Sequence, residues 1–379
     1  MELRLTGQQA KVRKAARRFA VHEVGPAVER MENEDAFPHE LIRRMAAQRL
    51  MGIPIAKEWG GAGADFISYV LAVNEISRVS AAVGVILSVH TSVATSPIVQ
   101  YGTDEQKRKY AVKLAKGEWL GAFALTEPQA GSDAASIRMS AVRDGDGYLL
   151  NGTKVFITNA GAADLYVTFA VTDPAKGAMG ITAFLVEKDS PGFRIGNKEK
   201  KMGLHGSNTC ELIFDHVLIP ADRRLGEEGQ GFAIAKGSLD GGRIGIGAQA
   251  LGIAEAALQA AKRHLLKRGA PRSGARLLPL HVQLAEMAAQ AEAARLLVYR
   301  AAYLRQEGLL CTKEASMAKM FASDTAVAIA GEAVRLLGAA GGMKEHTAER
   351  LFRDAKVTQI YEGTNEIHRI VIGNQLLNK

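Results

Sequence analysis

Residues 352–369 read FRDAKVTQIYEGTNEIHR, and two helical patterns meet inside this stretch. The first pattern runs to about Ile360, and the second begins at Thr364, a residue type that caps helix N-termini. Gly363 gives the backbone the freedom to turn between them. Glu362 is therefore a carboxylate at a sharp break, beside backbone N–H groups that could hold a ligand oxygen. A solvated loop glutamate is the commoner outcome for such a residue, so the rest of the chain has to decide its role.

The periodicity of apolar residues changes twice along the chain. It is helical up to about residue 118, alternates as in strands from about 119 to 226, and is helical again from 227 to 379. The sequence therefore predicts an α+β protein with an N-terminal helical domain (1–118), a middle antiparallel β domain (119–226) and a C-terminal helical bundle (227–379).

Caps and turn residues locate the elements. Thr6, Asp65 and Thr103 are predicted to cap helices, whereas Pro26 should end the first helix and Pro38 should begin the second. Strands are expected at 119–126, 136–143, 148–151, 154–158, 165–171, 182–187 and 209–217, and the later helices at 230–267, 280–306, 312–337, 345–360 and 364–376. Glycines crowd residues 241–247 inside a helix, where each costs about 1 kcal/mol relative to alanine. They predict close approach of another backbone or a ligand.

The composition is that of a globular protein, with 379 residues of which 47% are apolar and 23% charged. Cys210 and Cys311 form no motif, which fits a reducing compartment and excludes a disulfide scaffold or a cysteine zinc site. No two histidines lie four residues apart, so we expect no helical metal site. The longest apolar run, residues 83–89, is too short to cross a bilayer, and the charged N-terminus lacks a signal-peptide core. We expect a cytoplasmic protein outside the membrane.

The net charge of +8 is spread over many amphipathic segments and forms no basic strip interleaved with aromatic residues. We therefore expect no nucleic-acid partner, although the charge could attract a phosphate-bearing small molecule or an acidic protein. The sequence also lacks a strand-to-helix G-x-G-x-x-G, a P-loop and a G-x-S-x-G motif, which argues against the nucleotide-binding and hydrolase folds that carry them.

Two segments of the β domain offer ligand-binding groups. Residues 123–133 (FALTEPQAGSD) leave a strand at Thr126 and turn through Pro128 and Gly131, which brings hydroxyls and backbone N–H groups together. Residues 156–158 (FIT) end a nearby strand with an aromatic face beside a hydroxyl. Either segment alone would more often be an ordinary strand end.

Six motifs occur together and in order: LGAFALTEP (120–128), AGSD (130–133), ITNA (157–160), GSNTCEL (206–212), LDGGRI (239–244) and YEGT (361–364). In these motifs and their spacing the chain resembles the acyl-CoA dehydrogenase family over nearly its whole length. The short-chain (butyryl-CoA) branch looks nearest, and the predicted helical–β–helical order agrees with the fold of that family.

The resemblance implies an FAD enzyme of fatty acid β-oxidation that converts an acyl-CoA thioester to a trans-2-enoyl-CoA. Glu362 would remove the α-proton while FAD N5 accepts the β-hydride, and the electrons would pass to electron-transfer flavoprotein. The assembly would be a homotetramer built as a dimer of dimers. The implied FAD contacts are Phe123, Leu125, Thr126, Ser132, Phe156, Thr158, Thr364 and Glu366. The implied substrate contacts are Ser132, Asp240, Arg243 and Gly363.

This chemistry accounts for the residue types. An α-proton of a thioester is a weak acid, so hydrogen bonds must polarise the carbonyl. A carboxylate in a water-excluded pocket has a raised pKa and is a more effective base at neutral pH. Some relatives carry the base on the helix just before the substrate-contacting arginine. That position here is Gly242, so Glu362 has no visible rival.

The chain departs from the family in the two motifs that hold the diphosphate and adenine end of FAD across a subunit interface. Most members have Arg-x-x-Phe-Gly with a later Gln, and Gln-x-x-Gly-Gly-x-Gly; this chain has KRGAPR (267–272) with Leu278, and RLLGAAG (335–341). We predict that Arg268 or Arg335, with Gly338, makes these contacts, with Arg272 as a further candidate, because arginine suits phosphate.

Two alternatives remain open at this point. One is a flavin monooxygenase or oxidase on the same fold, which oxygen consumption would reveal. The other is a flavin-free acyl-CoA-binding protein, suggested by the altered FAD motifs and excluded by a yellow purified protein. Acyl chain length stays undetermined, because the floor of the pocket depends on helix packing near residues 89–97.

Overall fold

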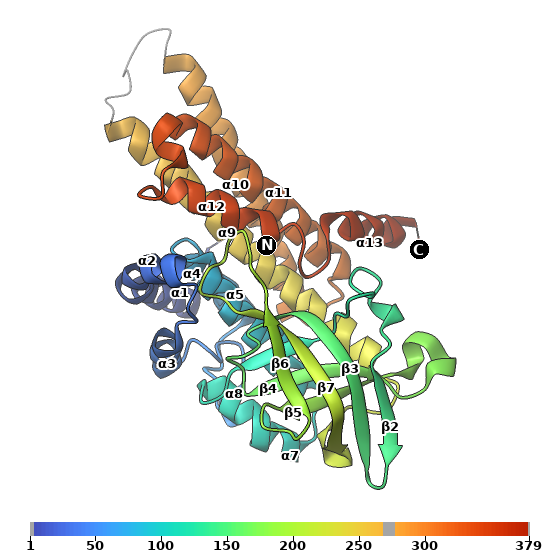
Figure 1. Ribbon diagram of the computed structural model, residues 1–379. Helices are drawn as coiled ribbons and strands as arrows, with labels where there is room; N and C mark the ends of the chain where they lie inside the picture. Colours follow the sequence, from blue (N-terminus) through green and yellow to red (C-terminus); the bar gives the residue numbers. More distant parts are fainter. Residues whose placement is uncertain (1–3, 268–276, 378–379) are drawn as a thin grey trace.

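The computed structural model describes residues 4–267 and 277–377. Figure 1 shows N-terminal helices beside a twisted sheet, with long C-terminal helices that extend away from both. The order of helices, sheet and helices predicted from the periodicity is confirmed.

Eight α-helices precede the sheet within the described residues. Their bounds are α1 Gly7–Phe19, α2 Gly25–Glu34, α3 His39–Ala47, α4 Phe66–Ser77, α5 Ala81–Val89, α6 Ser96–Tyr101, α7 Asp104–Gln106 and α8 Val112–Lys116. Thr6 and Thr103 each form a capping box, and Asp65 accepts the backbone N–H of Ser68 at 2.7 Å, so the three predicted caps are confirmed.

Pro26 does not end the first helix, which corrects the sequence prediction. A π-helical turn over Ala20–Val24 joins α1 to α2, and the N–H of Gly25 bonds to the carbonyl of Ala20, five residues back. This shift in the hydrogen-bond ladder lets Pro26 enter at the start of α2, where a missing N–H is tolerated. A second π-helical segment, His90–Thr95, joins α5 to α6 in the same way.

The middle of the chain forms one sheet with the strand order β6-β7-β3-β2-β4-β5-β8, and β1 pairs with β4. The strands are β1 Gly121–Ala124, β2 Ser140–Asp144, β3 Gly147–Thr158, β4 Leu165–Val171, β5 Ile181–Glu187, β6 Phe193–Lys198, β7 Thr209–Pro220 and β8 Arg224–Leu225. The sequence missed β6 and β8. It also split β3 in two, where the structure has one long strand with irregular pairing.

The prediction of a purely antiparallel sheet is wrong in part. β1 and β2 both pair with β4 in parallel, while the other pairs are antiparallel. A parallel pair needs a long connection, and the β2–β3 hairpin lies within the segment that joins β1 to β4. Strand periodicity carries no information on this pairing.

Five α-helices follow the sheet within the described residues: α9 Gly231–Lys267, α10 Leu277–Gln306, α11 Thr312–Leu337, α12 Thr347–Val357 and α13 Asn365–Leu377. One apolar core joins α9–α12 to the N-terminal helices; a second lies within the sheet, and a third joins the sheet to α6, α8 and the start of α9. The glycines of 241–247 are closely approached, but chiefly by side chains and not by the backbone or ligand predicted: a Cβ on Gly242 would lie 2.5 Å from Oε2 of Glu362, and one on Gly245 would lie 2.7 Å from the hydroxyl oxygen of Tyr69.

Within the described residues, two helices, Ala81–Tyr101 and Gly231–Lys267, are long and apolar enough to cross a membrane by length and composition. The first extends well beyond the apolar run at 83–89 on which the sequence prediction rested. Their apolar windows are 89% and 78% buried inside the protein, as expected of core helices.

Candidate active site

Glu362 lies on the turn between α12 and α13. The turn is closed by a hydrogen bond from the N–H of Asn365 to the carbonyl of Gln359 at 3.0 Å. Both Glu362 (φ 55°) and Gly363 (φ 93°) have left-handed backbone conformations. Such a conformation costs a non-glycine residue about 1–3 kcal/mol, and this kind of strain clusters at functional sites. As predicted, Thr364 caps α13, because its Oγ1 accepts the N–H of Ile367 at 3.3 Å.

The turn borders a cavity of about 570 Å³ between the sheet, the α5–α6 segment, α9 and the start of α13. The sequence-predicted residues that line it are Phe123, Leu125, Thr126, Ser132, Phe156, Thr158, Arg243, Glu362, Gly363 and Thr364. Segments more than 200 residues apart in the sequence therefore meet around one space.

Glu362 is half-buried and lines this cavity. Burial raises its pKa to about 7, although the positive charges of Arg243 and Lys319 act in the opposite direction. Its Oε2 is buried and has no hydrogen-bond partner among the described residues. A carboxylate beside a cavity, with a pKa near neutrality and one oxygen without a hydrogen-bond partner, is suited to accept a proton.

Gly242 on α9 provides the space for this carboxylate. A Cβ at Gly242 would lie 2.5 Å from Oε2 of Glu362 and 2.8 Å from its Cδ, closer than atoms can approach. The absence of a side chain at Gly242 is therefore a steric requirement of the Glu362 position.

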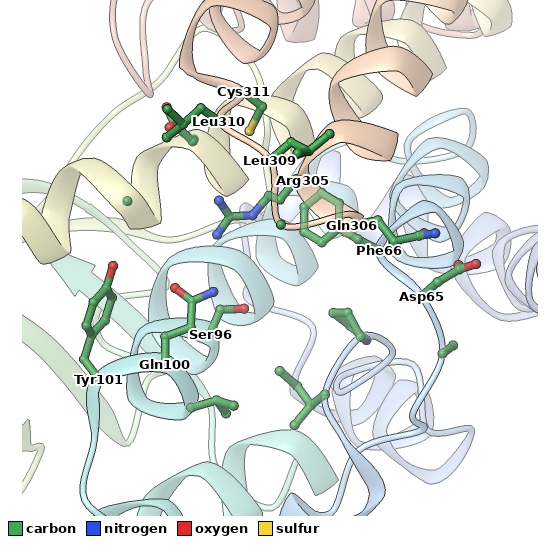
Figure 2. Close-up of a pocket in the computed structure, with 17 residues that line it drawn as sticks. Asp65, Phe66, Ser96, Gln100, Tyr101, Arg305, Gln306, Leu309, Leu310 and Cys311 are labelled. Carbon is green, nitrogen blue, oxygen red and sulfur yellow. The ribbon is translucent and has the colours of Figure 1, made fainter. Parts of the chain in front are cut away.

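Arg243 and Asp240 lie about one turn apart on α9 and border different cavities. Arg243 lines the catalytic cavity, and its Nη1 donates to Oδ1 of Asp240 at 3.0 Å. The other oxygen of Asp240 accepts from Oγ1 of Thr312 at 2.6 Å. Asp240 borders a second cavity of about 540 Å³. Arg305 and Cys311 line the same cavity (Figure 2). Asp240, predicted as a substrate contact, therefore orients Arg243 in the structure and does not line the cavity at Glu362.

Phe156 presents an aromatic face to the catalytic cavity. It lies where the pairing of β3 with β7 is shifted, has a φ of 57°, and keeps 63% of its surface exposed. Irregular strand pairing next to an active site commonly re-aims a side chain. A strained, exposed aromatic residue beside the hydroxyls of Thr126, Ser132 and Thr158 fits the predicted flavin ring, because a heteroaromatic ring needs a flat apolar contact and edge hydrogen bonds.

A buried ion pair that the sequence did not indicate supports this wall. Lys154 is completely buried and donates to Oε1 of Glu127 at 2.8 Å and to the carbonyl of Leu125 at 2.9 Å. Glu127 also accepts the backbone N–H groups of Arg138 (2.7 Å) and Met139 (3.0 Å). The pair thus ties the loop after β1 to β3.

A second buried lysine, Lys319 on α11, lies behind the Glu362 turn. The sequence contained a signal for it, because Lys319 falls on the same helical face as the buried Ala315, Ala318 and Ala322. A lysine on an apolar helix face indicates a specific partner.

The remaining predicted cofactor residues lie apart from the cavity. Glu366 is exposed on the first turn of α13. Arg335 is exposed near the end of α11, paired with Glu332, and Gly338 follows that helix. Arg335 is 16 residues beyond Lys319 along α11, or about 24 Å at the helical rise, so it does not border its own chain's cavity. Arg268 and Arg272 lie outside the described residues.

Comparison with known proteins identifies the family. Three domain models match: acyl-CoA dehydrogenase N-terminal domain at residues 6–118, middle domain at 122–217 and C-terminal domain at 229–377. An acyl-CoA dehydrogenase of Bacillus subtilis is 57% identical over 99% of both chains. The butyryl-CoA dehydrogenase structure from Megasphaera elsdenii is 45% identical with a TM-score of 0.96, covering 100% of both chains.

A further match is a chain in a structure described as the electron transferring flavoprotein of Acidaminococcus fermentans, with a view to flavin-based electron bifurcation. It is 46% identical, covers 100% of both chains and has a TM-score of 0.97. With the geometry of the cavity, these matches show that the chain belongs to the acyl-CoA dehydrogenase family and is an oxidoreductase that uses FAD.

Proposed function

We infer that this enzyme removes hydrogens from Cα and Cβ of a short-chain acyl-CoA, with Glu362 as the base, and passes the electrons to electron-transfer flavoprotein. The observation that carries the proposal is the Glu362 carboxylate, held by a strained turn in a cavity with a pKa of about 7 and one oxygen without a partner. The likeness to a butyryl-CoA dehydrogenase and to a chain in an electron transferring flavoprotein structure supports the substrate class and the partner.

Different residues of this chain would bind the FAD ring and remove the α-proton. Phe156, Thr126, Ser132 and Thr158 would hold the FAD ring, and FAD when bound accepts the hydride from Cβ. Glu362 would take the α-proton onto its carboxylate. The buried position excludes water, which keeps the pKa of Glu362 high enough for it to act as a base near neutrality.

The preference for a short chain is supported by the α5–α6 segment. Val85, Val89 and Val93 line the cavity, so branched side chains close it on that side. Each further CH₂ that fits adds about 0.8 kcal/mol of apolar burial, whereas one that does not fit is excluded sterically. Short acyl groups should therefore be dehydrogenated fastest.

A series of acyl-CoA thioesters tests the proposal. The purified yellow protein is mixed anaerobically with C4, C8, C12 and C16 acyl-CoA, and loss of the flavin absorption band is followed by stopped flow. We expect C4 to reduce the flavin fastest and the reduced enzyme to be reoxidised by electron-transfer flavoprotein. Fastest reduction by C12 or C16 would overturn the short-chain assignment, and no reduction by any member would overturn dehydrogenation.

The proposal extends to the assembly and the compartment. We place the enzyme in the cytoplasm as a homotetramer, in which the exposed Arg335 and Gly338 would meet the distal half of a neighbouring subunit's FAD. Multi-angle light scattering of the purified protein tests the tetramer, since a monomeric or dimeric mass would contradict it.

A further inference from the structure

Lys319 lies directly behind the catalytic turn. Its side chain is 0% exposed, and its Nζ donates to the carbonyl of Gly363 at 2.7 Å and to Oδ1 of Asn365 at 2.9 Å. Gly363 immediately follows Glu362, so this ammonium contacts the backbone at the residue that aims the carboxylate. The helix that carries Lys319, α11, is a long element of the bundle core and provides a rigid support.

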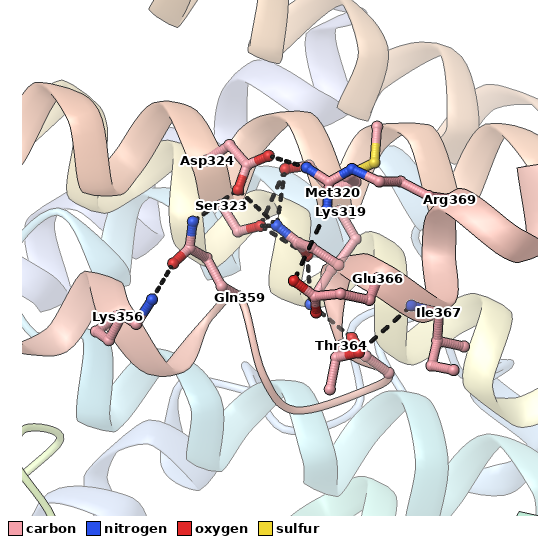
Figure 3. Close-up of polar contacts among 12 residues, drawn as sticks. Lys319, Met320, Ser323, Asp324, Lys356, Gln359, Thr364, Glu366, Ile367 and Arg369 are labelled. Carbon is pink, nitrogen blue, oxygen red and sulfur yellow. Dashed lines mark hydrogen bonds and ion pairs between the residues drawn. The ribbon is translucent and has the colours of Figure 1, made fainter. Parts of the chain in front are cut away.

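Further bonds fix both ends of the turn to α11 (Figure 3). The amide of Asn365 donates to Oγ of Ser323 at 2.9 Å and to Oδ1 of Asp324 at 2.7 Å. Gln359, before Glu362, donates to the same Oδ1 of Asp324 at 2.6 Å. Lys319 is thus the central of three attachments, and the one that contacts the left-handed residues of the turn.

Burying a lysine to hydrogen-bond a backbone carbonyl has a large free-energy cost. A neutral donor would form the bond to Gly363 without placing a charge in the protein interior, where an ammonium is strongly disfavoured. Burial lowers the pKa of Lys319 to about 7, and the charge of Glu362 is the largest effect that opposes this. The ammonium and the carboxylate therefore stabilise each other's charged forms, which a neutral donor could not do.

We propose that Lys319 is a positioning residue for the Glu362 base, which fixes the turn through the Gly363 carbonyl and places a positive charge behind the carboxylate. This rests on the proposed function of Glu362 as the base. Lys319 touches the backbone of the turn and is kept from the substrate by it, so its effect acts through Glu362.

Groups on several elements face Glu362 or Lys319, and they decide the sign of the effect. The charge of Arg243 from α9 acts on Glu362 and on Lys319, Asp324 and Glu366 act on Lys319, and Tyr69 of α4 feels the charge of Glu362. His368 of α13 has a pKa lowered to about 3, chiefly by burial, so it is neutral and cannot replace the lysine charge. Loss of the Lys319 charge leaves Arg243 alone to oppose burial, and the pKa of Glu362 must rise.

Three substitutions separate charge from hydrogen bonding. Lys319→Met removes both, Lys319→Gln keeps a donor without charge, and Lys319→Arg keeps the charge. The pH midpoint of flavin reduction by butyryl-CoA should rise by about one unit or more in the Met and Gln variants, because an opposite charge nearby shifts a pKa by about 1–3 units. The Arg variant should return the midpoint toward that of the parent. If Lys319→Met fails to fold, comparison of the pH midpoints of Lys319→Gln and Lys319→Arg still tests whether the lysine charge sets the midpoint.

An infrared titration gives the same information without turnover. The C=O band of protonated Glu362, assigned by its loss in Glu362→Gln, is followed against pH in the purified FAD-containing protein. We expect it to persist to higher pH in Lys319→Met than in the parent. If the parent is not reduced by any acyl-CoA, the proposed function fails, and the infrared titration still decides the role of Lys319.

Lys201→Met is the matched control, because it also deletes an ammonium whose pKa is lowered by burial and that donates to a backbone carbonyl, here that of Ser207 at 2.9 Å. Lys201 does not line the cavity at Glu362, so this variant should leave the Glu362 midpoint unchanged. An unchanged midpoint in folded Lys319→Met and Lys319→Gln would overturn the proposal. So would an equal shift in the Lys201→Met control, since the effect would then be general to loss of a lysine charge.

Discussion

Gly242→Ala should slow flavin reduction strongly and change the melting temperature little. The added Cβ would lie 2.5 Å from Oε2 of Glu362, whereas ordinary contacts begin at 3.4 Å. The carboxylate must therefore move by about 0.9 Å, the difference of these two distances. A misplacement of about 1 Å can reduce a rate about 100-fold. Alanine gains up to about 1 kcal/mol over glycine inside a helix, which offsets part of the crowding, so we expect little change in the melting temperature.

The assay is anaerobic flavin reduction by butyryl-CoA, measured together with thermal unfolding of the FAD-containing protein. Gly247→Ala is the control, since it lies in the same helix and its added Cβ would contact a side-chain methyl of Val298 at 3.1 Å, not Glu362. It should reduce flavin at the rate of the parent. Full activity in Gly242→Ala, or an equal loss in Gly247→Ala, would refute the steric argument.

Four further predictions follow from the site. Glu362→Gln should retain FAD and acyl-CoA but reduce flavin about 10²–10⁴-fold more slowly, and near-normal reduction would contradict the assignment. Because folding raises the Glu362 pKa to about 7, its contribution to stability falls as pH rises from about 4.5 to 7, so Glu362→Gln should gain stability relative to the parent over that window in thermal unfolding. Arg243→Ala should weaken acyl-CoA binding at unchanged flavin content; loss of flavin with normal substrate affinity would make Arg243 a structural or cofactor residue. Single Leu variants of Arg268, Arg272 and Arg335 should include at least one with about tenfold weaker and less salt-sensitive FAD binding, and three parental affinities would refute the arginine substitution.

The open alternatives have direct tests. Reduced enzyme that consumes oxygen as fast as it turns over would indicate an oxidase or monooxygenase on this fold. A dehydrogenase should instead require electron-transfer flavoprotein, and a colourless protein that binds acyl-CoA would indicate a flavin-free binding module.

Local signals in the sequence predicted much of the fold. The caps at Thr6, Asp65 and Thr103 and the turn at Gly363 follow from side-chain and backbone chemistry within four residues. The parallel pairing of β1 with β4 depends on a contact between strands some 40 residues apart, which periodicity does not encode. The prediction that Pro26 ends the first helix is wrong for a related reason. The π-helical turn that accommodates this proline depends on how the chain packs.

In the candidate site too, features with a local sequence signal could be predicted and those that depend on folding could not. Residues that line the cavity were found by motif, whereas the residues behind them were not. The family motif assigns Asp240 to the substrate together with Arg243, whereas in the structure Asp240 accepts hydrogen bonds from Arg243 and Thr312 and borders a different cavity. The supports Lys154 and Lys319 come from other elements, and only folding brings them to the cavity.

The two buried lysines show why one carboxylate is suited to be a base and the other is not. Each donates to a backbone carbonyl of the cavity wall, Leu125 for Lys154 and Gly363 for Lys319, and each has a glutamate as its main opposing charge. Burial alone would raise the pKa of Glu127, but the Lys154 charge and the hydrogen bonds from Lys154, Arg138 and Met139 lower it overall.

Glu362 receives no comparable set of bonds. Its Oε2 has no partner within the described parts of the chain, and burial dominates to leave its pKa at about 7. The hydrogen bonds of Lys319 go to the backbone of the turn and to Asn365, so the lysine makes no bond to the carboxylate and acts on it through its charge and through the backbone that it holds. A glutamate whose oxygens are saturated stays ionised and structural, as Glu127 does. One held by its backbone, with a nearby cation and a free oxygen, can exchange a proton near neutral pH, and this difference supports the proposal that Glu362 is the base.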